Sequence, residues 1–222
     1  QHGGNLFHSF SQFNLKQGET ATFSGPDQVT NIISRVTGGT RSDIDGTIRS
    51  EIPQANLLFI NPRGILFGPH ASLDVTGAVQ VTTADYLKLG DNGRFEATQP
   101  GKSILTAAPP SAFGFLGSQP AAIVVEGLAS AKQTVSLVGG DISIKGAWQA
   151  ANGQVTLNSV AGPGEVSITT PMTNPTEAIA GGNITLLSGA KISTDTKSEA
   201  KAGDIVIRAG NLTLQEWATI TS

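Results

Sequence analysis

Residues 55–68, ANLLFINPRGILFG, predict a strand, a tight turn and a second strand. The first half is an apolar run that is too short for a helix and rich in residues that favour strands. The NPRG that follows fits a type I turn. Asn61 can bond its own backbone two residues on, Pro62 presets φ at the second place, and Gly64 accepts an unusual φ at the fourth. The ILF after the turn resumes an extended chain.

A short unit recurs from residue 121 onward, in which a glycine and a polar residue precede two apolar residues separated by one other. Its copies begin at Gly140, Gly153, Gly164, Gly182 and Gly203. The last two lie about 21 residues apart. The strand expected at residues 191–194 has its expected counterpart at residues 211–214, continuing to residues 218–220. A period near 21 with two or three short strands indicates a parallel β-helix, and it predicts about eight or nine stacked coils.

We therefore predict an all-β fold, a right-handed parallel β-helix with an N-terminal capping segment and extra-helical β-hairpins. The right hand follows the preference of parallel crossover connections. A β-sandwich is the alternative, because it too has short alternating strands. It expects hairpin turns between adjacent runs, and only Asp45-Gly46, Asn152-Gly153 and Asn92-Gly93 qualify.

We expect a single domain over residues 1–222. Residues 1–35 hold four of the nine phenylalanines of the chain, Phe7, Phe10, Phe13 and Phe23. Clustered rings suit a lid on the open end of a stack, because a terminal coil otherwise presents bare strand edges and core. An ordinary aromatic core is the alternative interpretation.

Residues 85–120 combine four aromatic residues with four prolines, and the strand pattern fades there. We expect an excursion from the stack, with extra hairpins that pack on its flank. A linker between two domains is the alternative, although the aromatic content argues against a flexible linker. Residues 121–222 are expected to form the regular coils.

Composition excludes several classes of function. Only 14% of residues are charged and the net charge is −3, so no basic face for nucleic acid or anionic lipid is implied. The absence of cysteine excludes disulfides, thiol catalysis and thiolate metal sites. No apolar stretch approaches the roughly 20 residues that span a bilayer, so stable membrane insertion is not expected. The chain lacks an initial Met and stops inside a repeat, so we expect an amino-terminal fragment of a longer protein.

Catalytic constellations are sparse. Asp43 and Asp45 are two residues apart, so on one strand both would face the same side, as acid–base chemistry on sugars requires. The surrounding SDIDG is also typical of a solvated turn, and we favour that interpretation. No histidine pair has metal-ligand spacing, so we expect no metal, no cofactor and no enzyme activity. We interpret His8 as a residue that packs and hydrogen-bonds within the lid.

The sequence Asn61-Pro62-Arg63-Gly64-Ile65 resembles the Asn-Pro-Asn-Gly-Ile signature of the two-partner-secretion domain of filamentous-haemagglutinin-like exoproteins. The resemblance extends to residues 5–10 (NLFHSF), 31–38 (NIISRVTG) and 73–77 (LDVTG), and it covers about residues 3 to 100. Arg63 departs from the family pattern, which usually has a second Asn there. The turn chemistry is unaffected, but a direct role of this side chain in recognition is weakened.

The resemblance implies a non-enzymatic secretion domain of a large exoprotein or adhesin. Its implied partner is an outer-membrane TpsB transporter of the Omp85 type with periplasmic POTRA domains. The protein would cross the periplasm transiently, be secreted or reach the surface of a Gram-negative-type cell, and be a monomer. The residues implied in recognition or folding nucleation are Asn5, Phe7, His8, Phe10, Asn61, Pro62, Arg63, Gly64 and Ile65. A glycan- or surface-binding adhesin module and, with less support, a polysaccharide-cleaving enzyme are the alternatives.

Overall fold

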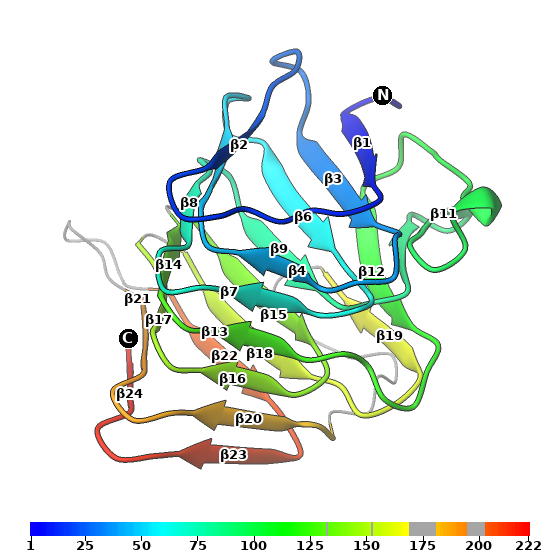
Figure 1. Cartoon of the computed structure of the whole chain (residues 1–222). Coiled ribbons are helices and arrows are strands. Elements are labelled where there is room, and N and C mark those ends of the chain that lie inside the picture. Colours follow the sequence, from blue (N-terminus) through cyan, green and yellow to red (C-terminus); the bar gives the residue numbers. More distant parts are fainter. Residues whose placement is uncertain (132, 152, 169–180, 195–202) are drawn as a thin grey trace.

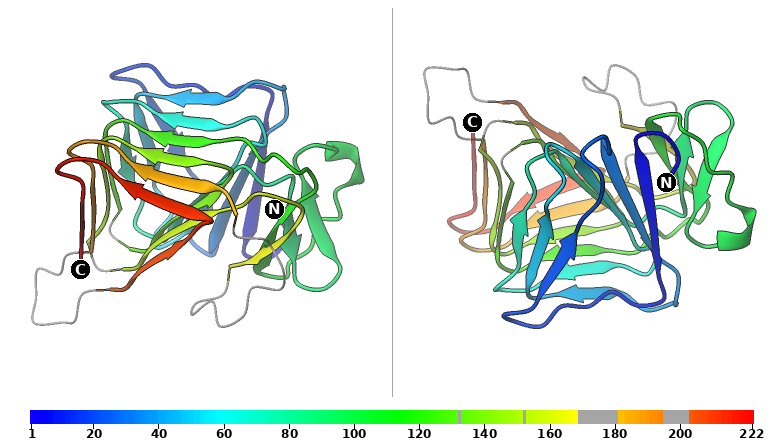
Figure 2. Two further views of the ribbon diagram at one scale, coloured as in Figure 1. Left: turned by 90° about the horizontal axis from the view of Figure 1, so that it is seen from below. Right: turned by 90° about the horizontal axis from the view of Figure 1, so that it is seen from above.

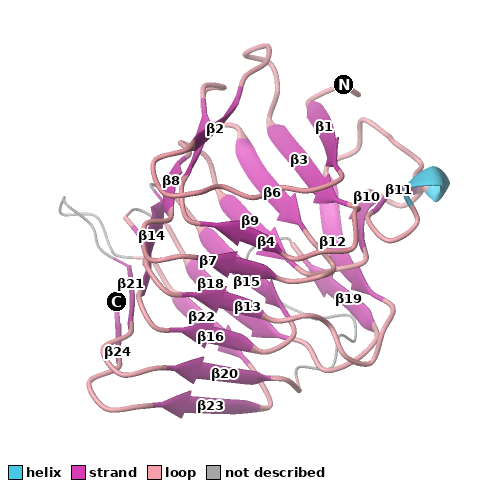
Figure 3. Ribbon diagram, viewed as in Figure 1, coloured by secondary structure: helices cyan, strands magenta, loops and turns pink. Residues whose placement is uncertain are grey.

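The computed structural model describes residues 1–131, 133–151, 153–168, 181–194 and 203–222. Nearly all regular structure is strand, and the strands stack into coils that wind along one axis (Figures 1 and 3). Parallel pairing relates each strand to its equivalent in the coils before and after, which confirms the parallel β-helix. The β-sandwich alternative is wrong, because its two sheets would be built from antiparallel neighbours.

The helix has three faces. The first sheet comprises β1 Asn5–Phe10, β3 Asn31–Val36, β6 Asn56–Ile60, β9 Val79–Thr82, β15 Val135–Gly139, β18 Val155–Ser159 and β22 Ile205–Arg208. The second sheet comprises β4 Ser42–Ile44, β7 Ile65–Phe67, β13 Ile123–Val125, β16 Ile142–Ile144, β20 Asn183–Leu186 and β23 Asn211–Leu214. The third face comprises β2 Thr20–Phe23, β5 Thr47–Ser50 and β8 Ser72–Asp74, followed by β14 Leu128–Ala131, β17 Ala147–Ala150, β21 Lys191–Thr194 and β24 Thr219–Thr221.

The main core fills the space between the three faces. Strand side chains alternate between the two sides of a sheet, so in β9 Val79 and Val81 are buried inside while Gln80 faces out. Residues in register stack above one another, as Val79, Val135 and Val155 do along the first sheet. The result is one continuous apolar column that runs the length of the stack.

A side sheet lies outside the helix and packs on the first sheet (Figure 2). It comprises β10 Tyr86–Leu89, β11 Gly93–Glu96, β12 Pro110–Phe115 and β19 Gly164–Ser167, with a short 3-10 turn, η1 Pro100–Lys102. Its pairing is antiparallel throughout. Buried residues such as Leu87, Phe95 and Phe113 pack on Ile33 and Leu58 of the first sheet, forming a second apolar cluster. Residues 85–120 are therefore folded against the stack.

The prediction that residues 164–168 form a coil strand is wrong. β19 pairs antiparallel with β12 and is the edge strand of the side sheet. Val166 is buried, but in the second cluster and not in the main core. The alternation of apolar residues indicates one buried face, and it cannot tell which sheet provides the partner.

The constant period is also wrong. Ile184 stacks between Ile142 and Leu212 in the second sheet, whereas Ile205 stacks on Val155 in the first sheet. Gly182 and Gly203 thus precede strands on different faces, in successive coils. β21 pairs with β24, within the expected continuation, while residues 211–214 stack on β20.

Coil length varies because the loops between strands absorb insertions while the strands stay in register. Asn31 and Asn56 are 25 residues apart on the first sheet, and Asn183 and Asn211 are 28 apart on the second. The first sheet has seven strands in the described part of the chain, fewer than the eight or nine coils expected. Within the same described ranges, no helix has the length and apolarity needed to span a membrane.

Candidate functional site: the first coil and the Asn61 turn

The first coil closes one end of the main core with aromatic rings. It consists of β1, a bridge between Leu15 and Ile44 in line with the second sheet, and β2. The Phe13 ring lies 5.2 Å from Phe10 and 4.9 Å from Phe59 of the third first-sheet strand, measured between centroids. Phe13 and Phe23 are buried, with 8% and 4% of their surface exposed. The end of the stack is thereby shielded from water.

Phe7 does not belong to this group of rings. Its neighbours on β1 face the main core, and alternation along the strand turns Phe7 to the outer face. There its ring lies 5.0 Å from Phe95 of the side sheet. Grouping all four early phenylalanines into one lid was therefore wrong for Phe7, which joins the first coil to the side sheet.

Arg35 reinforces this joint and was not singled out from the sequence. It lies on β3, and its guanidinium is 4.2 Å from the centroid of Phe95. Nη1 donates to Ser103 Oγ at 2.7 Å and to the Glu96 carbonyl, and Nε donates to Ser9 Oγ at 3.0 Å. Arg35 lies within residues 31–38, which carry part of the family resemblance, and this position was the sequence signal that could have indicated its importance.

A ladder of asparagines marks the start of the first-sheet strands. Asn31 Nδ2 donates to Asn5 Oδ1, Asn56 Nδ2 donates to Asn31 Oδ1, and Asn56 Oδ1 accepts from the Ala78 backbone, each at 3.0 Å. Asn5 is 1% exposed, and its Nδ2 donates to the carbonyls of Thr106 and Ala108. Asn5 thus links the coil ladder to the loop that precedes β12.

His8 points toward the closed end, where its ring lies 5.2 Å from Phe23 and stacks on Phe10 at 6.1 Å. Burial lowers the pKa of His8, and the nearby amino terminus lowers it further. Its Nε2 is buried and has no hydrogen-bond partner within the described part of the chain. The packing role holds, but the expected hydrogen bond from this nitrogen is absent.

The Asn61 turn has the geometry that its residues predict. Arg63 N–H donates to Asn61 Oδ1 at 2.9 Å, Gly64 N–H donates to the Asn61 carbonyl at 3.1 Å, and Gly64 has a φ of 105°. Asn61 is fully buried, and its Nδ2 donates to the Thr40 carbonyl and to Ser42 Oγ, both at 3.0 Å. The turn is therefore fastened to the preceding coil.

The other turn residues divide into buried and exposed members. Ile65 is 1% exposed and stacks between Ser42 and Ile123 in the second sheet. Pro62 is half-buried. Arg63 is exposed, and its side chain makes no hydrogen bond or ion pair with the residues that the structure describes. Arg63 is thus the member of this turn that a partner could reach at no cost to the fold.

The site residues named from the sequence form two groups and not one pocket. Asn5 lies at the start of β1, level with Asn56, the first residue of β6. Asn61 follows the last residue of the same β6, at the opposite end of the strand. The structure therefore places the Asn5 to Phe10 group and the Asn61 to Ile65 group at different corners of the early coils.

The acidic pair has separate partners. Asp43 Oδ1 lies 2.6 Å from Arg41 Nε at the surface. Asp45 accepts from the backbone of His70 at 2.8 Å and lies 3.1 Å from its Nδ1, and that backbone bond is the main reason its pKa is lowered. Among the described residues, no group of three or more His, Cys, Asp or Glu could hold a metal ion.

The two ends of the stack differ in how the core is covered. The outermost strands have a paired neighbour on one side only at both ends, β1 and β2 in the first coil and β22, β23 and β24 in the last. Leu212 and Leu214 are 44% and 47% exposed there, and Ile205, Ile207 and Ile220 are partly buried against the main core. Aromatic rings therefore cover the core at one end, whereas apolar side chains are left partly exposed at the other.

Comparison with known proteins agrees with this architecture. The family model described as "TPS secretion domain" matches residues 1–214. The crystal structure of the HMW1 secretion domain from Haemophilus influenzae aligns with a TM-score of 0.60 at 21% sequence identity, over 99% of this chain and 71% of that chain. At this identity the likeness shows the fold. Comparison with curated proteins found no match.

Proposed function

The chain belongs to the TPS secretion domain family, and on that premise we propose that it is the region of an exoprotein that a dedicated outer-membrane TpsB transporter recognises. We further propose that it seeds the folding of later coils outside the cell. The observation that carries this proposal is the difference between the sealed first coil and the open last coil.

A β-helix coil cannot bury its own apolar face, so it is stable only against a neighbour. The sealed end needs no such neighbour, because Phe10, Phe13 and Phe23 cover the core there. Strand edges are unpaired at both ends, but only at the last coil are core side chains partly exposed, so that strands adding in parallel to β22, β23 and β24 would bury apolar surface. Growth is therefore directed away from the first coil, and folding beyond the membrane would oppose backward movement of the chain.

The transporter would recognise the first coils, which fold before the rest of the chain. In the unfolded state, the alternating strands of residues 5–10 and 31–36 can pair with an exposed sheet edge in the periplasmic POTRA domains. The Asn61 turn adds a solvent-facing element, Arg63, beside a buried one, Asn61. The protein would pass the periplasm as a monomer and be secreted or displayed at the surface.

An export assay on a reporter fused after residue 222 tests the proposal. Deletion of residues 61–65 should block export. The chain also offers a cleaner pair of variants, since the Arg63 side chain has no polar partner among the residues that the structure describes, while the Asn61 side chain has three. If Arg63→Ala abolishes export at unchanged stability, the result would support direct contact between the transporter and the turn. If Arg63→Ala is exported normally and Asn61→Ala fails in proportion to its loss of stability, the turn acts only in folding.

A further inference from the structure

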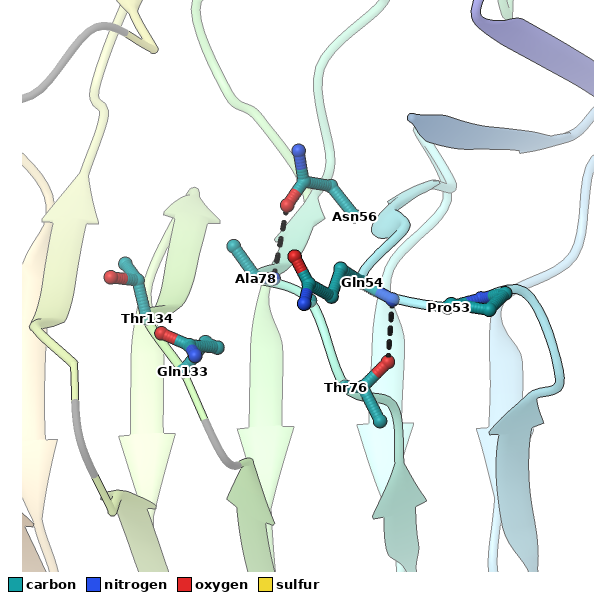
Figure 4. Close-up of a pocket in the computed structure, with 8 residues that line it drawn as sticks. Pro53, Gln54, Asn56, Thr76, Ala78, Gln133 and Thr134 are labelled. Carbon is teal, nitrogen blue, oxygen red and sulfur yellow. Dashed lines mark hydrogen bonds between the residues drawn. The ribbon is translucent and has the colours of Figure 1, made fainter. Parts of the chain in front are cut away.

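A polar groove follows the outer face of the first sheet beside the side sheet. It has two connected parts, hollows of about 620 Å³ and 260 Å³ that share Asn56, Ala78 and Thr134. The larger part lies where the chain enters the first-sheet strands, and Figure 4 shows Gln54 and Gln133 on either side of Ala78. The smaller part runs under the edge of the side sheet.

The floor of the groove repeats at the coil spacing. Gln80, Ser136 and Thr156 are aligned on β9, β15 and β18, and all three line the smaller hollow. Paired strands lie about 4.8 Å apart, so these polar groups form a row along the helix axis at that interval. Any ligand that uses the row crosses the strands at a right angle.

Several of these groups have hydrogen-bonding capacity to spare. Ser136 is only 6% exposed, and its hydroxyl has no partner within the described ranges of the chain. The side-chain amides of Gln54, Gln80 and Gln133 likewise have no partner there. The Ser136 hydroxyl opens onto the groove, because it is not one of the fully enclosed polar atoms that lack a partner. The row therefore offers accessible donors and acceptors to a ligand that lies in the groove.

The backbone of Gln54 is strained. Its φ is 54°, in the left-handed region that residues with a side chain seldom occupy, and its N–H donates to Thr76 Oγ1 at 2.9 Å. Such a conformation costs on the order of 1–3 kcal/mol. A glycine would relieve the strain, so the glutamine side chain has a use at this place.

The chemistry of the lining selects a neutral ligand. None of the residues that line the two hollows is Asp, Glu, Lys, Arg or His. Amides and hydroxyls form the floor, and Phe113, Val138 and Ile168 form an apolar wall. A sugar ring matches both, since it has hydroxyls at its edge and C–H groups on its face. A peptide matches less well, because its residues advance by about 3.3 Å and not by the coil spacing.

We propose that this groove binds an extended, neutral glycan that lies along the helix axis. Gln80, Ser136 and Thr156 contact successive sugar units, and Gln54 and Gln133 hold the chain where the groove widens. This inference does not depend on the proposed export function, because the folded protein alone carries the site.

The test is calorimetric titration of the full chain with cellotetraose and chitotetraose as neutral probes and tetragalacturonate as an anionic probe of the same length. We expect saturable binding of at least one neutral probe and at least tenfold weaker binding of the uronate. Ser136→Ala and Gln54→Gly should each weaken binding at least fivefold without lowering the melting temperature. Gln133→Ala gives a third, exposed variant, and Gln17→Ala, on the surface outside the groove, is the control.

Three results would overturn the proposal: no neutral probe binds, the uronate binds equally well, or the groove variants bind as tightly as the parent. A fourth is saturable binding of an unrelated extended peptide in the same groove with no glycan binding, which would assign the row to a protein partner.

Discussion

Substitution of Asn61 by alanine should destabilise the fold, and by far more than the same substitution at Arg63 in the same turn. The side chain is fully buried and makes three hydrogen bonds, to the Thr40 carbonyl, to Ser42 Oγ and from the Arg63 N–H. Each contributes about 0.5–1.5 kcal/mol net, so the loss is about 3 kcal/mol. The Thr40 carbonyl is also left without this donor.

The assay is thermal unfolding followed by circular dichroism. For a domain of this size, 1 kcal/mol lowers the melting temperature by roughly 2–4 °C, so Asn61→Ala should lower it by about 6–12 °C. The matched control is Arg63→Ala, in the same turn but exposed and without a polar side-chain partner in the described part of the chain, which should change stability by less than about 0.5 kcal/mol. A drop below 2 °C for Asn61→Ala, or equal drops for the two variants, would refute the view that this turn is fastened through its asparagine.

Three further predictions concern single side chains. Burial lowers the pKa of His8, so the stability linked to its neutral ring is present above the unfolded pKa of about 6.5 and is lost as pH falls. The free energy of unfolding in urea should therefore differ less between pH 7.5 and pH 5.5 for His8→Phe than for the parent. Burial, and after it the hydrogen bond to Glu165, raises the pKa of Tyr86 to about 12. Because Tyr86 is the only tyrosine of the chain, an ultraviolet titration should show this value as its midpoint. Glu165→Gln should lower the midpoint but leave it above 10. Arg35→Lys should cost about 1–3 kcal/mol in chemical unfolding, because an ammonium cannot both cover the Phe95 ring and reach its two serine partners; an unchanged unfolding midpoint would contradict that role.

Local chemistry was predictable from the sequence where one residue type has one suitable conformation. Asn61 bonds the backbone two residues on, and Gly64 takes a positive φ, as the order Asn-Pro-x-Gly indicates. The same holds for the short strands and the glycine-marked corners, which sufficed to predict a parallel β-helix.

Partner choice between strands was less predictable. The strands at Gly164 and Gly182 have the same pattern, yet one pairs antiparallel in the side sheet and the other stacks in a coil. Phe7 and Phe10 are equally apolar, but their positions on β1 send them to opposite faces. In each case the deciding contact comes from a part of the chain that is distant in sequence, such as Phe95 or Phe113.

The origin of the last side-sheet strand has a kinetic consequence. β12 ends at Phe115, and the strand that completes its edge, β19, begins only at Gly164, after β13 to β18 of the intervening coils. High sequence separation between contacting residues slows folding. During synthesis or stepwise export, the β12 edge has no partner strand until Gly164 has emerged. Chains that end before Gly164 therefore expose an unpaired strand edge, which the longer chain covers with β19.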